Sequence, residues 1–367
     1  MPIYMDRHDI TEKVTSAQIA EMHQEDLKVE DQYGCRGLTY WFDSVRNTAF
    51  CLIEAPDMSA VTAMHAHAHG QVPGRIIEVN ADLVESFLGR IEDPERPSHM
   101  AENIIDESAF RIIMLVTVKL LSAPSKDAKT PNTGWEDFSK TIQQTVRASG
   151  GKTVKQNGQR LVISFASVSS AVESAFEIQS SFDKGSFEPH TSLKIGLSAG
   201  EPVTDKSTFF EDTIRMAERM CKIVKGDIIL SAEVKELYDN EKPQGLPHRK
   251  KTRCLSAMDQ RFLTSLMDFT ESAWRNFDFK VDDFGKPIGC SKSQLYRKMI
   301  SLTGKSPNSF IKEYRLNEAL SLLNKQVKNV SEVAFETGFN SPSYFSKCFQ
   351  KQYGRSPSDY LAQLSQP

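Results

Sequence analysis

The hydrophobic pattern divides the chain into three regions with different periodicities. In residues 1–89, two helical stretches at 16–32 and 56–70 are preceded, separated and followed by short runs rich in aromatic and β-branched residues, which predict strands. Thr15 and Gln18 can form a capping box at the start of the first helix. The resulting β-α-β-β-α-β order predicts a ferredoxin-like α/β sandwich.

Residues 109–240 alternate strands with helices. The region opens with a strongly apolar run at 111–121, continues with a helical stretch at 135–149, and keeps alternating to residue 239. This alternation predicts a second α/β sandwich. The polar, proline-containing segments 90–108 and 241–254 are predicted linkers.

Residues 255–367 have helical patterns only. The segments 281–304 and 331–354 share a short apolar helix, a tight turn with glycine (Gly289, Gly338) and a second helix that opens on capping residues. A helix presented in this way fits the DNA major groove, and two units would contact two successive grooves. The fold class expected is therefore a multidomain α+β protein, with two sandwiches followed by an all-α tandem helix-turn-helix domain.

Composition and charge narrow the class of protein. No apolar run approaches the ~20 residues that a membrane helix needs, and the charged N-terminal sequence has no signal-peptide core. The six cysteines are scattered without a CxxC pair, which favours reduced thiols in a cytoplasmic protein without a membrane partner. Residues 255–367 hold 15 basic and 11 acidic residues, whereas the rest holds 30 and 37, so the positive excess lies where DNA would bind.

Capping residues define the register of the two recognition helices. Ser291 and Gln294 form a capping box for the first, and Asn340 or Ser341 can cap the second, with Pro342 in its first turn. The core positions expected on these helices are Leu295, Met299, Ile300, Phe345, Cys348 and Phe349. The outward positions expected are Lys292, Ser293, Tyr296, Arg297, Lys298, Pro342, Ser343, Tyr344 and Lys347.

Among the outward side chains, Arg297 is the best candidate base reader, because a guanidinium group can bond guanine O6 and N7 together. Lys298 and Lys347 are expected to contact phosphates, which position a protein without specifying sequence. A long helix that starts at Ser306 could hold the two units about one DNA turn, ~34 Å, apart. One such pattern alone would fit an amphipathic bundle equally well, but two in tandem favour DNA binding.

The run from Ser256 to Leu364 closely resembles the DNA-binding domain of AraC-type transcription regulators. The resemblance rests on the G-F-x-S-x-S-Y-F-S-x-x-F-x-K run and on the closing G-x-S-P-x-x-Y. This chain departs from the family at Phe284-Gly285 and Pro287, where glycine and proline cost about 1 and 3 kcal/mol in a helix interior. The resemblance implies base-reading positions at Ser293, Gln294, Tyr296, Arg297, Pro342, Ser343 and Lys347.

A histidine cluster, MHAHAH, lies at the end of the second predicted helix. His65 and His69 lie four residues apart on one helix face, a spacing that can chelate a transition metal, whereas His67 points away. His23 on the first helix is the natural third candidate, and imidazole ligands suit nickel, copper or zinc. The alternative is a solvated helix end whose histidines interact with the helix dipole.

Residues 2–89 also resemble a small ferredoxin-like family described as nickel-binding. The matching elements are PIYMD, His23 with Asp26-Leu27 downstream, YGCRGLTYWFD, AFCLIEAPD and AMHAHAHG. The resemblance implies that His23, His65 and His69 bind nickel or another transition metal.

Residues 109–240 are similar to class III nucleotide cyclases, whose catalysis requires two metal-binding aspartates. The first strand contains no carboxylate, and Gln159 stands where the second aspartate is expected. Arg219 matches one residue of the transition-state pair, whereas Arg215 replaces an asparagine. The resemblance therefore implies a catalytically inactive sensor or dimerisation module, and no catalytic residue is expected.

These features predict a sequence-specific transcription regulator that binds double-stranded DNA as a homodimer. The N-terminal domains would respond to a metal ion or an unidentified small molecule. Two alternatives remain open: a nucleotide-responsive regulator that uses the cyclase-like domain, and a metal-buffering protein. A third, an enzyme that makes cyclic nucleotides, would lack its metal-binding aspartates.

Overall fold

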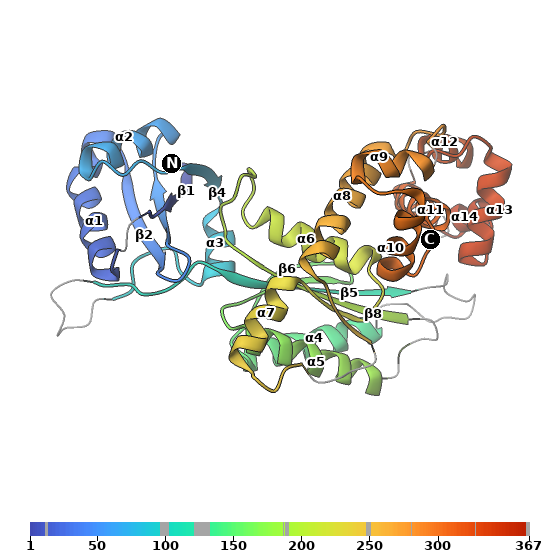
Figure 1. Ribbon diagram of the computed structural model, residues 1–367, viewed down its shortest axis with the longest axis horizontal. Coiled ribbons are helices and arrows are strands. Elements are labelled where there is room, and N and C mark those ends of the chain that lie inside the picture. Colours follow the sequence, from blue (N-terminus) through green and yellow to red (C-terminus); the bar gives the residue numbers. More distant parts are fainter. Residues whose placement is uncertain are drawn as a thin grey trace.

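Three bodies follow one another along the longest axis of the molecule, with the N-terminal domain at one end and the helical C-terminal domain at the other (Figure 1). The computed structural model describes residues 1–11, 14–95, 103–120, 133–185, 187, 191–246, 251–279, 281–326 and 328–364. Within these ranges no helix combines the length and apolar character that spanning a membrane requires.

The N-terminal domain contains one four-stranded antiparallel sheet, in the order β2-β3-β1-β4. Its helices α1 and α2 pack side by side over one face of the sheet (Figure 1). The β-α-β-β-α-β order agrees with the sequence prediction and is that of a ferredoxin-like sandwich. The elements are β1 (Ile3–Asp9), α1 (Ser16–Val29), η1 (Glu30–Tyr33), β2 (Arg36–Asp43), β3 (Thr48–Glu54), α2 (Met58–Ala68) and β4 (Arg75–Val79).

Local capping explains where the two helices of this domain begin. The predicted box of Thr15 and Gln18 is present at α1, and the Asp57 side chain accepts a hydrogen bond from the Ala60 backbone at the start of α2. A further helix, α3 (Ala81–Leu88), follows β4 and has no counterpart in the sequence prediction. It buries Val84, Phe87 and Leu88 in the core that the sheet shares with the rest of the molecule.

The middle domain is built on a six-stranded sheet in the order β10-β9-β8-β5-β7-β6. Strand β5 pairs antiparallel with β7 and β8, whereas β8 pairs parallel with β9. The elements are β5 (Arg111–Leu120), α4 (Thr133–Ala148), β6 (Lys152–Asn157), β7 (Arg160–Phe165), α5 (Val168–Lys184), β8 (Thr191–Gly200), α6 (Glu211–Ile223), β9 (Ile228–Leu230), α7 (Ala232–Glu241) and β10 (Thr252–Cys254). Strand β10 lies within the segment for which the sequence predicted a linker.

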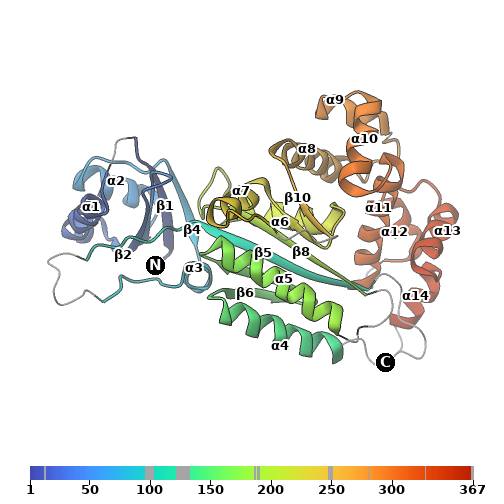
Figure 2. The same cartoon turned by 60° about the horizontal axis from the view of Figure 1, so that its bottom comes forward.

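Side chains on β5 alternate between two separate cores, because successive residues of a strand point to opposite faces. Ile112 and Met114 pack with α4, α5 and α7, whereas Ile113 and Leu115 pack on the side of α6. Helices α4 and α5 therefore cover one face of the sheet, and α6 covers the other (Figure 2).

The C-terminal domain is all helical apart from short connections, as the sequence predicted. Its helices are α8 (Ala257–Ala273), η2 (Val281–Phe284), α9 (Gly285–Ile288), α10 (Lys292–Thr303), α11 (Pro307–Asn324), α12 (Val330–Glu336), α13 (Pro342–Tyr353) and α14 (Pro357–Leu364). The first helix of the first unit is reduced to a 3-10 turn and one α-turn, η2 and α9. Gly285 and Pro287, which lie in this segment, are poor helix formers and account for the break.

Candidate nucleic-acid interface and metal centre

Both recognition helices are capped at their N-termini. The Ser291 side chain accepts from the Gln294 backbone, and the Gln294 side chain completes the predicted capping box of α10. At α13 the cap is Ser341, not Asn340, and it accepts from the Tyr344 backbone with Pro342 in the first turn. Side-chain acceptors at these positions satisfy N–H groups that the helix leaves unpaired, so each helix begins at a defined residue.

Most of the predicted DNA-contacting side chains are exposed on these two helices. Pro342 is half-buried, and the Lys298 ammonium lies 5.3 Å from the centre of the Phe262 ring on α8. The exposed members are Lys292, Ser293, Gln294, Tyr296, Arg297, Lys298, Ser343, Tyr344 and Lys347.

Two of the expected core positions differ in the structure. Leu295, Met299, Phe345 and Phe349 are buried as predicted, but Ile300 is 40% exposed. It lies one residue beyond Met299, on the flank of α10, where the neighbouring helices do not cover it. Cys348 is half-buried beside the core of the second unit.

The predicted histidine pair, His65 and His69, lies in a buried cluster of charged groups between the sheet and the two helices of the N-terminal domain. The imidazole of His65 is fully buried, with Nε2 2.8 Å from the Asp6 carboxylate and Nδ1 3.0 Å from the Asp26 carboxylate. His69 Nε2 lies 3.3 Å from both His65 Nδ1 and Asp26 Oδ1. The predicted pair of His65 and His69 is therefore brought together.

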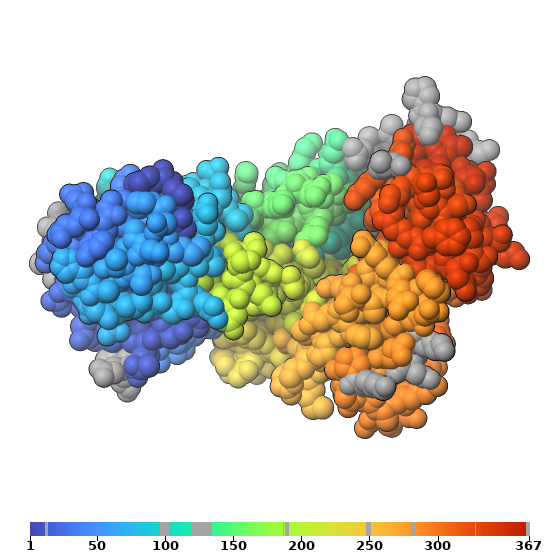
Figure 3. Space-filling view, turned by 90° about the horizontal axis from the view of Figure 1, so that it is seen from above, coloured from blue at the N-terminus to red at the C-terminus, as the bar shows by residue number. Residues whose placement is uncertain are grey.

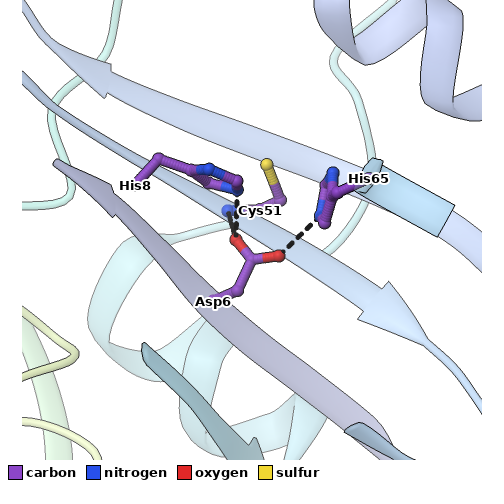
Figure 4. Close-up of side chains that lie close together, drawn as sticks. All are labelled: Asp6, His8, Cys51 and His65. Atoms are coloured by element: carbon purple, nitrogen blue, oxygen red, sulfur yellow. Dashed lines mark hydrogen bonds and ion pairs between the residues drawn. The ribbon is translucent and has the colours of Figure 1, made fainter. Parts of the chain in front are cut away.

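Strand β1 and strand β3 add further ligand atoms on the other side of His65 (Figure 4). His8 Nε2 lies 3.4 Å from Asp6, and the Cys51 backbone donates to the same carboxylate. Two sets of candidate metal ligands result, in each of which the ligand atoms lie within 4.8 Å of one another. One set is Asp6, His8, Cys51 and His65, and the other is Asp26, His65 and His69.

The electrostatics of this cluster favour a cation. Burial lowers the pKa of the His65 imidazolium, but the carboxylates of Asp6 and Asp26 outweigh it and raise that pKa to about 10. Burial would raise the pKa of Asp6, yet His8 and His65 outweigh it and lower the pKa far below its usual value. Asp6 and Asp26 therefore stabilise a positive charge placed between them, which in this structure is the imidazolium of His65.

The other two histidines of the prediction lie differently. His23 Nε2 is 3.3 Å from the Asp93 carboxylate, and His23 belongs to neither set of candidate ligands. It does line a cavity of 230 Å³ together with His8, Asp26 and His69. His67 is exposed, and its Nδ1 lies 3.0 Å from the Tyr33 hydroxyl, so it points away as predicted.

The sequence did not predict Asp6, His8, Asp26 or Cys51 as metal ligands. Two local signals were present: Asp6 and His8 lie on one face of a predicted strand, and Asp26 follows His23 by three residues on a predicted helix. The approach of Asp6 and His8 to Cys51 depends on the register of β1 against β3, in which Met5 faces Leu52 and His8 faces Ala49. Hydrophobic patterns do not specify such a register completely.

A larger cavity, of 690 Å³, lies where all three domains meet. Its wall includes Arg7 and Arg46 from the N-terminal domain, Glu201 and Glu233 from the middle domain, and Gln260 from α8. Burial, with the neighbouring charge of Glu201, raises the pKa of Glu233 despite the proximity of Arg46. Cavities of this size at domain junctions are common ligand sites.

The middle-domain residues that the sequence analysis compared with cyclase catalytic positions contact other parts of this chain. Gln159 lies in the turn between β6 and β7, as the sequence suggested. Arg219 is 4% exposed and donates to Asp268 and Glu271 of α8, so its guanidinium is occupied by the C-terminal domain. Arg215 pairs with Glu211 on its own helix.

This arrangement defines a class of protein with a helix-turn-helix domain and a separate α/β domain that holds a histidine cluster. A family model described as helix-turn-helix domain matches residues 286–363. A second, described as nickel responsive protein SCO4226-like, matches residues 4–79.

Parts of the chain are also similar to individual proteins. The chain is 37% identical over 112 residues to histidine kinase P4 of Formosa agariphila, covering 30% of this chain and 8% of that protein. It is 34% identical over 98 residues to the HTH-type transcriptional regulator MtrA of Neisseria gonorrhoeae, covering 27% of this chain and 31% of that protein. The crystal structure of SCO4226 from Streptomyces coelicolor A3(2) shares 35% identity over 21% of this chain and 94% of that one, with a TM-score of 0.20.

The chain thus spans less than a third of the length of these two curated relatives. The expected similarity of the C-terminal domain to AraC-type transcription regulators is confirmed. The N-terminal domain, expected to resemble a nickel-binding family, matches a family described as nickel responsive, and nickel binding itself stays a prediction. The similarity of the middle domain to nucleotide cyclases stays a prediction.

Proposed function

We propose that this chain is a sequence-specific transcription regulator that binds double-stranded DNA through its C-terminal domain. The observation that carries the proposal is the pair of capped recognition helices, α10 and α13, whose predicted DNA-contacting side chains lie largely exposed on one domain. Homodimerisation, which would place four recognition helices on one operator, is part of the same proposal.

The proposed contacts are of two kinds, those with base edges and those with phosphates. Arg297 reads guanine from α10, with Ser293, Gln294 and Tyr296 beside it on base edges. Lys292, Lys298 and Lys347 neutralise phosphates, and Lys298 would leave the Phe262 ring to do so. Pro342 and Ser343 bring the start of α13 close to the second groove.

Fluorescence anisotropy with the full chain and the DNA upstream of its own gene tests the proposal. At fixed salt, we expect that DNA to bind at least about a thousandfold more tightly than a shuffled duplex of equal length, the lower end for specific binders. Equal affinities for the two duplexes, repeated with duplexes enriched from a random pool, would overturn it.

A transition metal ion is the effector that we propose for the N-terminal domain. Imidazole, thiol and carboxylate donors together suit nickel, copper or zinc. Two buried atoms that could bind it, His8 Nε2 and Asp26 Oδ1, face other ligand atoms of the cluster, His8 Nε2 at 3.4 Å from Asp6 and Asp26 Oδ1 at 3.0 Å from His65. The ion would be held either by His65 and His69 with Asp26, or by His65 with Asp6, His8 and Cys51. Asp6 and Asp26 face opposite ring nitrogens of His65, so the ion would replace the proton on the nitrogen that faces its own set.

The same binding assay separates this proposal from the alternatives. We expect DNA affinity to change by about 5- to 150-fold between chelator and nickel or zinc, the usual range of coupling between two sites. Tight metal uptake without any change in DNA affinity would indicate a metal-buffering protein. A response to ATP or GTP instead would favour a nucleotide effector, which the pairing of Arg219 with α8 argues against. The 690 Å³ cavity is the place that we propose for an unidentified small-molecule effector.

A further inference from the structure

We infer that the middle domain is a structural part of the first helix-turn-helix unit and positions its recognition helix α10. The inference rests on the proposed DNA binding for its functional meaning, but its physical basis is the interface between α6, α8, α10 and α11. Arg219 and Arg253 are the positioning residues at this interface.

The apolar cores of the two units differ in origin. Leu295, Met299 and Leu302 of α10 belong to one continuous core with α8 and with Met220 and Cys221 of α6. The second unit has a core of its own, formed by α11 to α14 around Phe345 and Phe349. Figure 3 shows the first unit, in orange, against the yellow-green surface of the middle domain, with the red second unit adjoining it. The first unit is therefore completed by another domain.

The C-terminal end of α10 is held by backbone-directed hydrogen bonds from the middle domain. The Lys225 backbone N–H donates to the Leu302 carbonyl at 2.9 Å, and the Arg253 guanidinium donates to the Ser301 carbonyl. The last carbonyls of a helix have no partner within the helix, and a positive group there also interacts favourably with the helix dipole. Both effects fix the position of α10 relative to β10 and α6.

Charged side chains on α6 hold the two neighbouring helices. Arg219 donates to Asp268 at 2.5 Å and to Glu271 at 2.9 Å on α8. Lys222 donates to Glu318 of α11 at 2.8 Å, and its ammonium lies 4.0 Å from the centre of the Tyr314 ring. Arg219 is nearly buried, whereas Asp268 and Glu271 are about half exposed, so the two ion pairs lie at the edge of the interface between α6 and α8.

The first unit needs this support more than the second. Its leading helix is only η2 and α9, with Gly285 and Pro287 in place of a regular helix. The second unit instead begins with α12, which has a capping box formed by Asn329 and Glu332. A helix that packs against a short, irregular neighbour is positioned by its other contacts. For α10 these come from α11 within its own domain, and from α8, α6 and β10.

A change in the middle domain would therefore alter DNA binding by changing the position of α10. Two recognition helices bind together only when their separation matches successive major grooves, about 34 Å apart. A displacement of α6 would move α10 while the second unit kept its own core. The middle domain would thereby regulate binding at one of two subsites.

Footprinting with the full chain tests the inference. We expect Arg219→Ala to weaken protection of the subsite read by α10 by about tenfold, within the usual range of coupling between sites, while the subsite read by α13 stays protected. Arg219→Lys, which keeps the charge, should retain most of the protection. Arg215→Ala is the matched control, because Arg215 lies on the same helix but pairs with Glu211 of that helix.

Hydrogen exchange separates this inference from the proposed function, since it requires no DNA. In Arg219→Ala, and in Arg253→Ala should the first variant fail to fold, we expect faster exchange in α10 and unchanged exchange in α13. Equal acceleration in both helices, or in neither, would overturn the inference even if the protein binds DNA. If the wild-type chain does not bind DNA specifically, but exchange is faster in α10 and unchanged in α13 of Arg219→Ala, only the proposed function is overturned.

Discussion

Asp6 and Arg7 are neighbours on β1 whose side chains serve opposite faces of the N-terminal sheet. The Asp6 carboxylate lies 2.8 Å from His65 in the histidine cluster, and the Arg7 guanidinium lies 2.8 Å from Glu201 of the middle domain. Arg7 also donates to the Val203 carbonyl, in the segment that leads to α6. One strand therefore joins the proposed metal site to the domain that supports α10.

Because Arg7 contacts the middle domain, we expect Arg7→Ala to leave nickel binding intact and to reduce the effect of nickel on DNA affinity. Nickel affinity should stay within about twofold, because Arg7 is not among the ligands, while the nickel-dependent change in DNA affinity falls by at least about half on a logarithmic scale. Calorimetry and anisotropy measure the two quantities. Arg36→Ala is the control, since Arg36 pairs with Glu54 and Glu92 on the outside of the same domain. If the nickel-dependent change in DNA affinity in Arg7→Ala equals that of the wild-type chain, the contact between Arg7 and the middle domain does not transmit the effect of metal binding.

The two histidines at the end of α2 should differ in their effect on metal uptake. His65→Ala should weaken nickel binding by more than about tenfold, since even the loss of outer-shell groups costs about 10- to 100-fold. His67→Ala removes the same side chain two residues away, where it contacts the hydroxyl and the ring of Tyr33, and should leave nickel affinity unchanged. Equal losses in both variants would place the metal on the helix surface.

Removal of Arg297 should lower the affinity for specific DNA and leave the affinity for shuffled DNA nearly unchanged. A lost bidentate contact to guanine costs about 1–3 kcal/mol of discrimination. Arg147→Ala, on the exposed face of α4, removes the same charge far from the recognition helices and controls for electrostatics. Anisotropy at constant salt provides the measurement, and an equal loss on both duplexes would reassign Arg297 to a phosphate contact.

The turn glycines of the two units should not tolerate alanine equally. Both adopt left-handed backbone conformations, with φ of +66° at Gly289 and +76° at Gly338. A Cβ at Gly338 would lie 2.6 Å from the Trp274 carbonyl oxygen, whereas one at Gly289 would meet no described atom within 4 Å. Gly289→Ala should cost about 1–2 kcal/mol from the backbone alone, and Gly338→Ala should cost clearly more. Thermal unfolding compares them, and equal destabilisation would contradict the close approach.

Acid should remove the stabilisation that Asp43 provides between the first two domains. Burial would raise the pKa of Asp43, but hydrogen bonds from Ser108 and Arg46 outweigh it and lower that pKa. A carboxyl whose folded pKa is depressed stabilises the fold above its unfolded pKa of about 3.9, and this contribution disappears as the pH falls. Asp43→Asn should therefore cost about 1 kcal/mol at neutral pH and progressively less below pH about 4. Asp205→Asn, at an exposed ion pair with Arg75, should show a much smaller difference.

The order of elements was predictable because it depends on neighbours in sequence. The capping boxes at Thr15 and Ser291 join residues three apart, and both are present. The β-α-β-β-α-β order and the tandem units followed from periodicity, which records which face of each element is buried. The same reasoning missed α3 and β10, both short elements whose formation depends on contacts with other parts of the chain.

The sequence by itself determined the elements, the two recognition helices and the pairing of His65 with His69, because each of these depends on residues within a few turns of one another. Only the tertiary structure decided that Asp6 and Asp26 enclose His65, since the register of strands and the docking of helices bring distant residues together. It also decided that Arg219, the residue that matched a catalytic position, holds α8. A side chain's role depends on what packs against it, and that is set by contacts between domains.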